Sequence, residues 1–434
     1  MNVTPAHSGL GWPDISSRII SRSVSLDVHD HLDMHILEAF PSGTDPTATS
    51  FPLILLLHGF PELAYSWRKI IVPLADAHSG YHVVAPDLRG FGRTKPRAYV
   101  ENPRQVQYDD PLAPFHILAV AEDVRSLVRA LGYTSVAMFV GHDFGSPLAG
   151  HCVIAHPDMY KSVVFMSAPF TGVDRPPSLV DQSTDGKATT PGKPTASPVA
   201  TVASALAALD PPRRHYTAYF CTPGANSDML AGDEAGLYEF LRGYIYMKGG
   251  KWIGNTTHPL PSASASSLPS IDELANDLAI LPEYYVMPLH EDMKSIVLRQ
   301  AREYLLTRPK EDELECAIYA TEYYRTGFQG GLNYYRCALS PPPPERAEQI
   351  LQLAGRRVHI PAAFIAGARD WGVYQTPGAE RKMREIVYGA RRGEGGMDPE
   401  DFVLIEGAGH WLQQEAPEEV VTELVRFLGK VKTR

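Results

Sequence analysis

Short apolar runs alternate with helical patterns along much of the chain, and this alternation restricts the fold more than any other feature of the sequence. Four runs precede residue 170 and two follow residue 356, at 53–57, 81–85, 136–140, 163–166, 362–366 and 402–405. A strand that is apolar at every position is buried on both faces, as in a parallel sheet covered by helices. We therefore predict an α/β fold with a mostly parallel central sheet flanked by helices.

The character of the sequence changes between these two groups of strands. Residues 171–355 are aromatic and helical in pattern, which predicts a helical cap domain inserted into a core domain made of 1–170 and 356–434. Within the cap, residues 174–200 are rich in Pro, Thr, Ser, Gly and Lys and have no apolar period. Because such a segment buries too little apolar surface to repay its ordering, we expect a mobile insertion there.

Helix ends are indicated by glycine and proline. Apolar residues recur at helical spacing over 120–131, and Gly132 follows as a predicted C-terminal cap. A last helix is predicted to begin at Pro417 and to end at Gly429.

The composition of the chain limits which kinds of partner it is expected to bind. The 434 residues carry a formal net charge of -10, which disfavours binding to nucleic acid or to anionic membranes. No apolar run is long enough to cross a bilayer, and the N-terminus does not have the pattern of a secretory signal. The four cysteines lie far apart and form no C-x-x-C pair, so we expect reduced thiols, no metal site and a cytoplasmic location.

The strongest chemical signal is Gly141-His142-Asp143-Phe144-Gly145, between a predicted buried strand and a predicted helix. A nucleophile on such a turn stands at the end of the sheet, and glycines two residues before and after it let the flanking elements approach. Asp143 is ionised at neutral pH, so it can attack carbon without a separate base. The alternative is a glycine-rich turn in which Asp143 only caps the helix.

Two further residues follow late strands in the order that a triad on such a fold requires. Asp370 comes just after the run 362–366, and His410 just after 402–405. Upstream, His58-Gly59-Phe60-Pro61 follows the first buried run, where a cis Pro61 would fix the turn. The N–H groups of Phe60 and Phe144 are predicted to form an oxyanion hole, although the tetrapeptide alone also fits a plain tight turn.

Three motifs together resemble those of the soluble epoxide hydrolases of the α/β-hydrolase fold. They are 58–62 (HGFPE), 141–145 (GHDFG) and 407–411 (GAGHW). The resemblance covers about 51–430, is patchy in the cap and is absent from 174–200. Phe144 and Tyr334 depart from it, because the family commonly has Trp at both positions, so we expect a changed pocket shape.

The resemblance implies a role for each matching residue. Asp143 would be the nucleophile that forms a covalent ester, His410 the base for water, and Asp370 the carboxylate that orients His410. Two cap tyrosines would hydrogen-bond the epoxide oxygen, and the segments 327–336 and 216–224 point to Tyr335 and Tyr216. The product would be a vicinal diol, and neither an organic cofactor nor a metal is implied.

Two other functions remain open at this point. A haloalkane or haloacid dehalogenase on the same fold also uses Asp and His, but Phe144 lacks the ring N–H that would hold a halide. A non-catalytic binding protein is the second alternative, since a fold does not fix a function. We expect a small-molecule epoxide as the partner, and a homodimer is compatible with the sequence. The epoxide itself is not encoded in these patterns.

Overall fold

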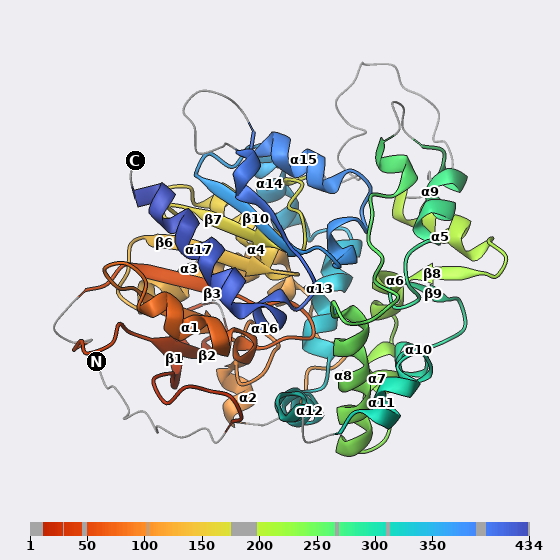
Figure 1. Cartoon of the computed structure of the whole chain (residues 1–434), viewed down its shortest axis with the longest axis horizontal. Helices are drawn as coiled ribbons and strands as arrows, with labels where there is room; N and C mark the ends of the chain where they lie inside the picture. The colour runs from red at the N-terminus through yellow and green to blue at the C-terminus, as the bar shows by residue number, and fades with distance from the viewer. Residues whose placement is uncertain are drawn as a thin grey trace.

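The computed structural model describes residues 12–28, 30–45, 50–101, 104–174, 198–264, 269–309, 313–387 and 396–432 (Figure 1). Its strands are β1 (Ile20–Leu26), β2 (Leu32–Ala39), β3 (Leu53–Leu57), β4 (His82–Pro86), β5 (Lys95–Pro96), β6 (Val136–His142), β7 (Val163–Met166), β8 (Arg213–His215), β9 (Val286–Pro288), β10 (Ala362–Gly367) and β11 (Phe402–Ile405). All but β8 and β9 belong to one sheet, in the order β1-β2-β4-β3-β6-β7-β10-β11, with β5 beside β2.

Helices account for most of the remaining described residues. The α-helices are α1 (Arg68–Ala75), α2 (Arg97–Glu101), α3 (Ile117–Ala130), α4 (Gly145–Ala155), α5 (Pro198–Ala207), α6 (Tyr216–Phe220), α7 (Ala225–Leu230), α8 (Glu234–Lys248), α9 (Ile271–Leu278), α10 (Met293–Gln300), α11 (Arg302–Thr307), α12 (Leu314–Thr326), α13 (Gln329–Leu339), α14 (Pro344–Leu353), α15 (Ala379–Ile386), α16 (Leu412–Glu415) and α17 (Pro417–Lys432). Short 3-10 helices include η1 (Ala64–Trp67), η2 (Ala113–Phe115), η4 (Pro261–Ser264), η6 (Trp371–Val373) and η7 (Pro399–Asp401).

The sheet confirms the predicted parallel core. Strands β4, β3, β6, β7, β10 and β11 pair in parallel, and all six coincide with the predicted apolar runs to within two residues at each end. Strands β1 and β2 were not predicted. They form an antiparallel pair at the edge of the sheet. The outermost strand β1 carries the alternating apolar and polar residues of a strand that is buried on one face, whereas β2, between β1 and β4, is buried along almost its whole length.

Helices cover both faces of the sheet, and an apolar cluster fills each interface. Side chains of α3 and α4, such as Val124 and Leu148, pack in one cluster. Side chains of α1 and α17, such as Ile70 and Leu424, pack in the other. Because both faces are covered, the central strands are buried along their whole length, which explains their uninterrupted apolar sequences.

Between β7 and β10 the described chain is mainly helical. Helices α5 to α11 and the two-stranded antiparallel sheet of β8 and β9 lie beside the main sheet, on the right in Figure 1. This arrangement fits the predicted inserted cap, although its boundaries at 171 and 355 stay a prediction. Of the predicted mobile insertion 174–200, residues 175–197 lie outside the described residues, and residues 198–200 already belong to helix α5.

The helix ends were predicted with mixed success. Helix α3 ends before Gly132, whose φ of +86° is the left-handed conformation expected of a glycine cap. The predicted end of the last helix at Gly429 is wrong, because α17 continues to Lys432. Lys430 forms ion pairs with Asp398 and Asp401, and this tertiary contact favours helix beyond the glycine.

Candidate active site

Asp143 stands on a sharp turn between the end of β6 and the start of α4. Its φ is +50°, a strained backbone conformation for a residue that is not glycine. A Cβ atom on Gly141 would lie 2.0 Å from the Gly145 carbonyl oxygen, and one on Gly145 would lie 2.5 Å from the Leu57 carbonyl oxygen. Only glycine at these two positions lets strand, turn and helix approach this closely, as the sequence pattern predicts.

The structure brings the three predicted triad residues together. His410 Nε2 lies 3.3 Å from Asp143 Oδ2, an ion-pair distance without the alignment of a hydrogen bond. On the other side of the ring, Nδ1 lies 3.1 Å from both carboxylate oxygens of Asp370. Asp370 follows β10 and also accepts a hydrogen bond from the Gly372 N–H at 2.7 Å. Asp370 and His410 are each only 1% exposed and Asp143 is 9% exposed, so all three sit in a low-dielectric interior.

The electrostatics of the triad follow from this mutual contact. Burial alone would raise the pKa of Asp143, but the contact with His410 and its charge hold that pKa far below its ordinary value. Burial and the nearby Lys248 lower the pKa of His410, whereas Asp370 and Asp143 raise it, with a net result of about 9. The resting pair is therefore a carboxylate beside an imidazolium at neutral pH.

The turn after β3 supplies a backbone donor to the nucleophile. The Phe60 N–H donates to Asp143 Oδ1 at 2.9 Å, and the Phe60-Pro61 peptide bond is cis. Phe144 occupies the residue before α4, as predicted, and its ring lies 4.8 Å from that of Tyr334 and 6.2 Å from that of Tyr335. Aromatic rings thus take the places in which the resemblance led us to expect tryptophan.

Both predicted cap tyrosines lie in this aromatic cluster. Tyr216 begins α6 and Tyr335 lies on α13, and their ring centroids are 5.9 Å apart. Burial raises the pKa of each phenol, and the charge of Asp143 raises both further. Because the phenols remain protonated at neutral pH, both can donate hydrogen bonds.

A second buried polar cluster supports the turn, and sequence reasoning assigned it no role. Glu62 Oε2 lies 2.5 Å from His142 Nδ1, and Gln413 Nε2 donates to Glu62 Oε1. His142 Nε2 lies 2.8 Å from the His410 carbonyl oxygen, so the cluster connects the nucleophile turn to the histidine loop. Glu62 and His142 lie within the recognised motifs, and their motif position is the signal that could have identified them.

Lys248 is a further residue that the sequence did not single out. It ends α8, is 4% exposed, and lies close enough to influence the pKa values of Asp143, Asp370 and His410. A single lysine at the end of a helix carries no sequence signal that distinguishes it from a solvated one.

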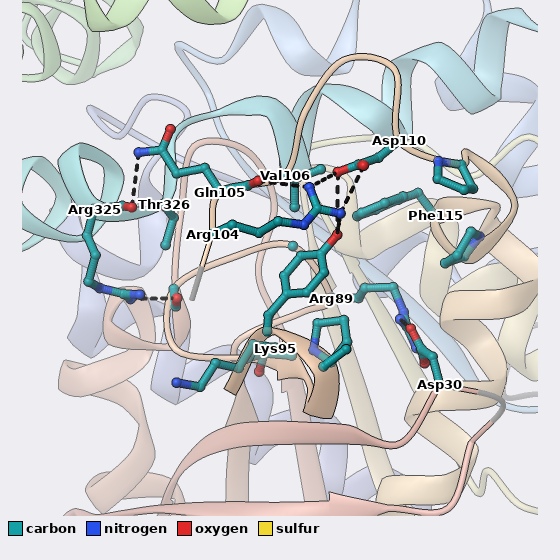
Figure 2. Close-up of a pocket in the computed structure, with 18 residues that line it drawn as sticks. Asp30, Arg89, Lys95, Arg104, Gln105, Val106, Asp110, Phe115, Arg325 and Thr326 are labelled. Atoms are coloured by element: carbon teal, nitrogen blue, oxygen red, sulfur yellow. Dashed lines mark hydrogen bonds and ion pairs between the residues drawn. The ribbon is translucent and has the colours of Figure 1, made fainter. Parts of the chain in front are cut away.

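A surface cavity of about 650 Å³ lies near this site but is not lined by the triad (Figure 2). Gly90 and Phe115 line it, together with Arg89, Arg104 and Arg325. The arginines pair with Asp30 and Asp123, with Asp110 and with Glu322, respectively. The Phe115 ring lies 6.3 Å from that of Tyr334, which in turn contacts Phe144.

The described ranges contain neither of two other kinds of feature. Within those ranges, His, Cys, Asp and Glu side chains form no group of three or more that could hold a metal ion. In the same part of the chain, helices that combine the length and apolarity needed to cross a membrane are absent.

Comparison with known proteins agrees with this geometry. Residues 52–192 match the model of the alpha/beta hydrolase fold. The chain is 30% identical to epoxide hydrolase A of Mycobacterium tuberculosis over 385 residues, which cover 88% of this chain and 92% of that one. It is also 30% identical to epoxide hydrolase B of the same organism over 408 residues, which cover 93% and 99% of the two chains.

Solved structures give the same result. The crystal structure of epoxide hydrolase A from Mycobacterium thermoresistibile is 27% identical, with a TM-score of 0.62, and the match covers 94% of this chain and 98% of that one. A laboratory-evolved potato epoxide hydrolase is 26% identical, with a TM-score of 0.61 and coverage of 95% and 99%. With Asp143 on the predicted turn, His410 and Asp370 beside it, and relatives aligned over most of their length, the chain belongs to the epoxide hydrolase family of the α/β-hydrolase fold.

Proposed function

We propose that this protein hydrolyses an epoxide to a vicinal diol through a covalent ester on Asp143. The observation that carries the proposal is the ionised carboxylate on the strained turn, 3.3 Å from a histidine that a second carboxylate holds. The relatives named above are epoxide hydrolases, and the two buried phenols near Asp143 are suited to a substrate whose ring oxygen becomes an alkoxide.

The first step opens the ring. A carboxylate oxygen of Asp143 attacks one epoxide carbon, the bond from that carbon to the ring oxygen breaks, and the electron pair stays on the oxygen. Tyr216 and Tyr335 hydrogen-bond the emerging alkoxide, which takes up the proton that the His410 imidazolium gives up. The products of this step are a hydroxyl group and an ester on Asp143.

The second step hydrolyses the ester. His410, neutral and oriented by Asp370, removes a proton from water while the water oxygen attacks the ester carbonyl carbon. The Phe60 and Phe144 N–H groups hold the oxyanion, an effect worth roughly 3 kcal/mol per donor. The intermediate then releases the diol and restores the Asp143 carboxylate beside a protonated His410.

An isotope experiment tests the ester directly. With enzyme in excess over a competent epoxide in ¹⁸O-labelled water, the first turnover should give an unlabelled diol, because its new oxygen comes from Asp143. The peptide that contains Asp143 should gain the label. Label in the diol of the first turnover would mean direct attack by water and would refute the ester.

Two variants test the separate roles. Asp143→Ala should abolish turnover, whereas His410→Gln should form the ester but not hydrolyse it, leaving an adduct visible by mass spectrometry. His290→Gln, which changes an exposed histidine, serves as the matched control. A His410→Gln enzyme that accumulates no adduct would refute this assignment, and halide release from a haloalkane panel would favour the dehalogenase alternative.

The predicted cytoplasmic location belongs to the same proposal, and a homodimer is compatible with it. The four cysteines are all free in the structure, which fits a reducing compartment. Sedimentation of the purified protein measures the oligomeric state, and fractionation of the source cells measures the location.

A further inference from the structure

Lys248 is a buried lysine in an aromatic cage, where burial lowers the pKa of its amine and the charges of Asp143 and Asp370 raise it. Its Nζ lies 5.5 Å from the ring centroid of Tyr244, 5.2 Å from that of Tyr285 and 5.3 Å from that of Trp411. Among the residues that the structure describes, no carboxylate lies within 4 Å of this ammonium group. A buried charge without an ion pair is costly, and the three ring faces offset only part of that cost. The carboxylates of Asp143, Asp370 and Glu62 also counter that cost, which links the charge of Lys248 to the active site.

The cage lies directly against the histidine of the triad. The backbone N–H of His410 donates to the Lys248 carbonyl oxygen at 2.9 Å, and the ring centroids of Trp411 and His410 are 4.5 Å apart. A Cβ atom on Gly409 would lie 2.6 Å from that same carbonyl oxygen. The end of α8 and the loop after β11 are thus in backbone contact, and the Trp411 ring lies against both the ammonium group and the His410 imidazole.

We propose that Lys248 is a positioning residue for ester hydrolysis, whose positive charge makes His410 release its proton once Asp143 has become an ester. The inference rests on the proposed function and adds to it the control of one half-reaction.

The charges around His410 explain how this control works. In the resting enzyme, Asp370 and Asp143 together outweigh burial and Lys248, and the pKa of His410 is raised. Ester formation removes the charge of Asp143 and leaves Asp370 opposed by Lys248 and by burial. The pKa of His410 must then fall, so the imidazolium becomes the neutral base that water activation requires.

The protons balance over the cycle. Ring opening creates one alkoxide, which takes up the one proton that the imidazolium gives up. Hydrolysis of the ester to a carboxylate and an alcohol releases one proton from water, which returns to His410. The resting ion pair is restored, and the net reaction is epoxide plus water to diol.

Other ionisable groups face the cage from the elements packed against it. Glu62 is paired with His142, and burial raises the pKa of Glu415 although its carboxylate accepts backbone N–H bonds from Gly250, Gly409 and Trp411. Arg369 donates to the carbonyl groups of Gly250, Trp252 and Asn255. Burial raises the pKa of the nearby phenols, so they stay neutral; they are Tyr244, Tyr284 and Tyr285. Asp143 is therefore the acidic group whose charge disappears.

The experiment measures both half-reactions against pH. Rapid-quench sampling and mass spectrometry follow ester formation and ester hydrolysis in wild type, Lys248→Met, Lys248→Arg and the exposed control Lys251→Met. In Lys248→Met, the pH at which hydrolysis is half-maximal should rise by at least one unit, which is about a tenfold loss of rate below that pH. The ester should accumulate, while ring opening changes by less than about threefold and Lys248→Arg stays near wild type.

Two results would overturn the inference. One is a Lys248→Met hydrolysis profile that coincides with wild type. The other is an equal shift in Lys248→Arg, which would show that packing and not charge matters. Circular dichroism checks that Lys248→Met is folded. If it is not, Lys248→Gln replaces it, with the same expected shift in the pH profile of ester hydrolysis and the same result that would overturn the inference. Absence of any ester in the wild type would instead contradict the proposed function.

Discussion

Replacing His410 by Gln should change how the stability of this protein depends on pH. The folded-state pKa of His410 is about 9, against an ordinary value of 6.5, because two carboxylates favour the imidazolium. A pKa raised by folding stabilises the protein fully below pH 6.5, and this contribution disappears as the pH rises through 9. The two values differ by about 2.5 pH units, which corresponds to about 3 kcal/mol of unfolding free energy at ~1.4 kcal/mol per unit.

Urea unfolding at pH 6 and pH 10 measures this quantity. Wild type should lose about 3 kcal/mol more between these two pH values than His410→Gln does, because groups common to both proteins cancel in the comparison. The exposed control His290→Gln should follow wild type. Parallel pH dependence in wild type and His410→Gln would refute the argument that the resting histidine is held as a cation by Asp143 and Asp370.

Three further substitutions test other parts of the site. Tyr335→Phe should slow ring opening by about 10- to 1000-fold in pre-steady-state assays, because one alkoxide donor worth a few kcal/mol is lost. The control Tyr324→Phe, which changes an exposed tyrosine, should open the ring at the wild-type rate. Equal ring-opening rates in Tyr335→Phe and wild type would exclude the donor role. Asp370→Asn should lower kcat by roughly 10⁴ and let the ester accumulate, since the amide no longer fixes the imidazole; a normal steady-state ester level in mass spectra would contradict this. Gly145→Ala should destabilise the fold by about 2 kcal/mol or more in urea unfolding, because the alanine Cβ would lie 2.5 Å from the Leu57 carbonyl oxygen. An unchanged urea midpoint would show that the turn can relax and would contradict this prediction.

The elements that the sequence predicted best are those whose signal is local. Strands β3 and β7 coincide with the predicted runs at both ends, because a strand buried on both faces must be apolar at every position. Strands β1 and β2 were missed, although the edge strand β1 carries an alternating pattern. The predicted end at Gly429 failed because ion pairs of Lys430 with distant residues outweigh the weak helix preference of glycine.

By itself, the sequence determined the type of fold and predicted the turn at Asp143 and the three residues proposed as a triad, because glycine spacing and strand ends are local features of the sequence. Tertiary structure decided the rest. Asp143, Asp370 and His410 are separated by up to 267 positions in the sequence numbering. Only the order of strands in the sheet brings the His410 ring within 3.3 Å of both carboxylates. The cage around Lys248 depends in the same way on Tyr285 and Trp411 from other segments. A buried charge acquires its environment from packing between distant residues, and no local pattern encodes that packing.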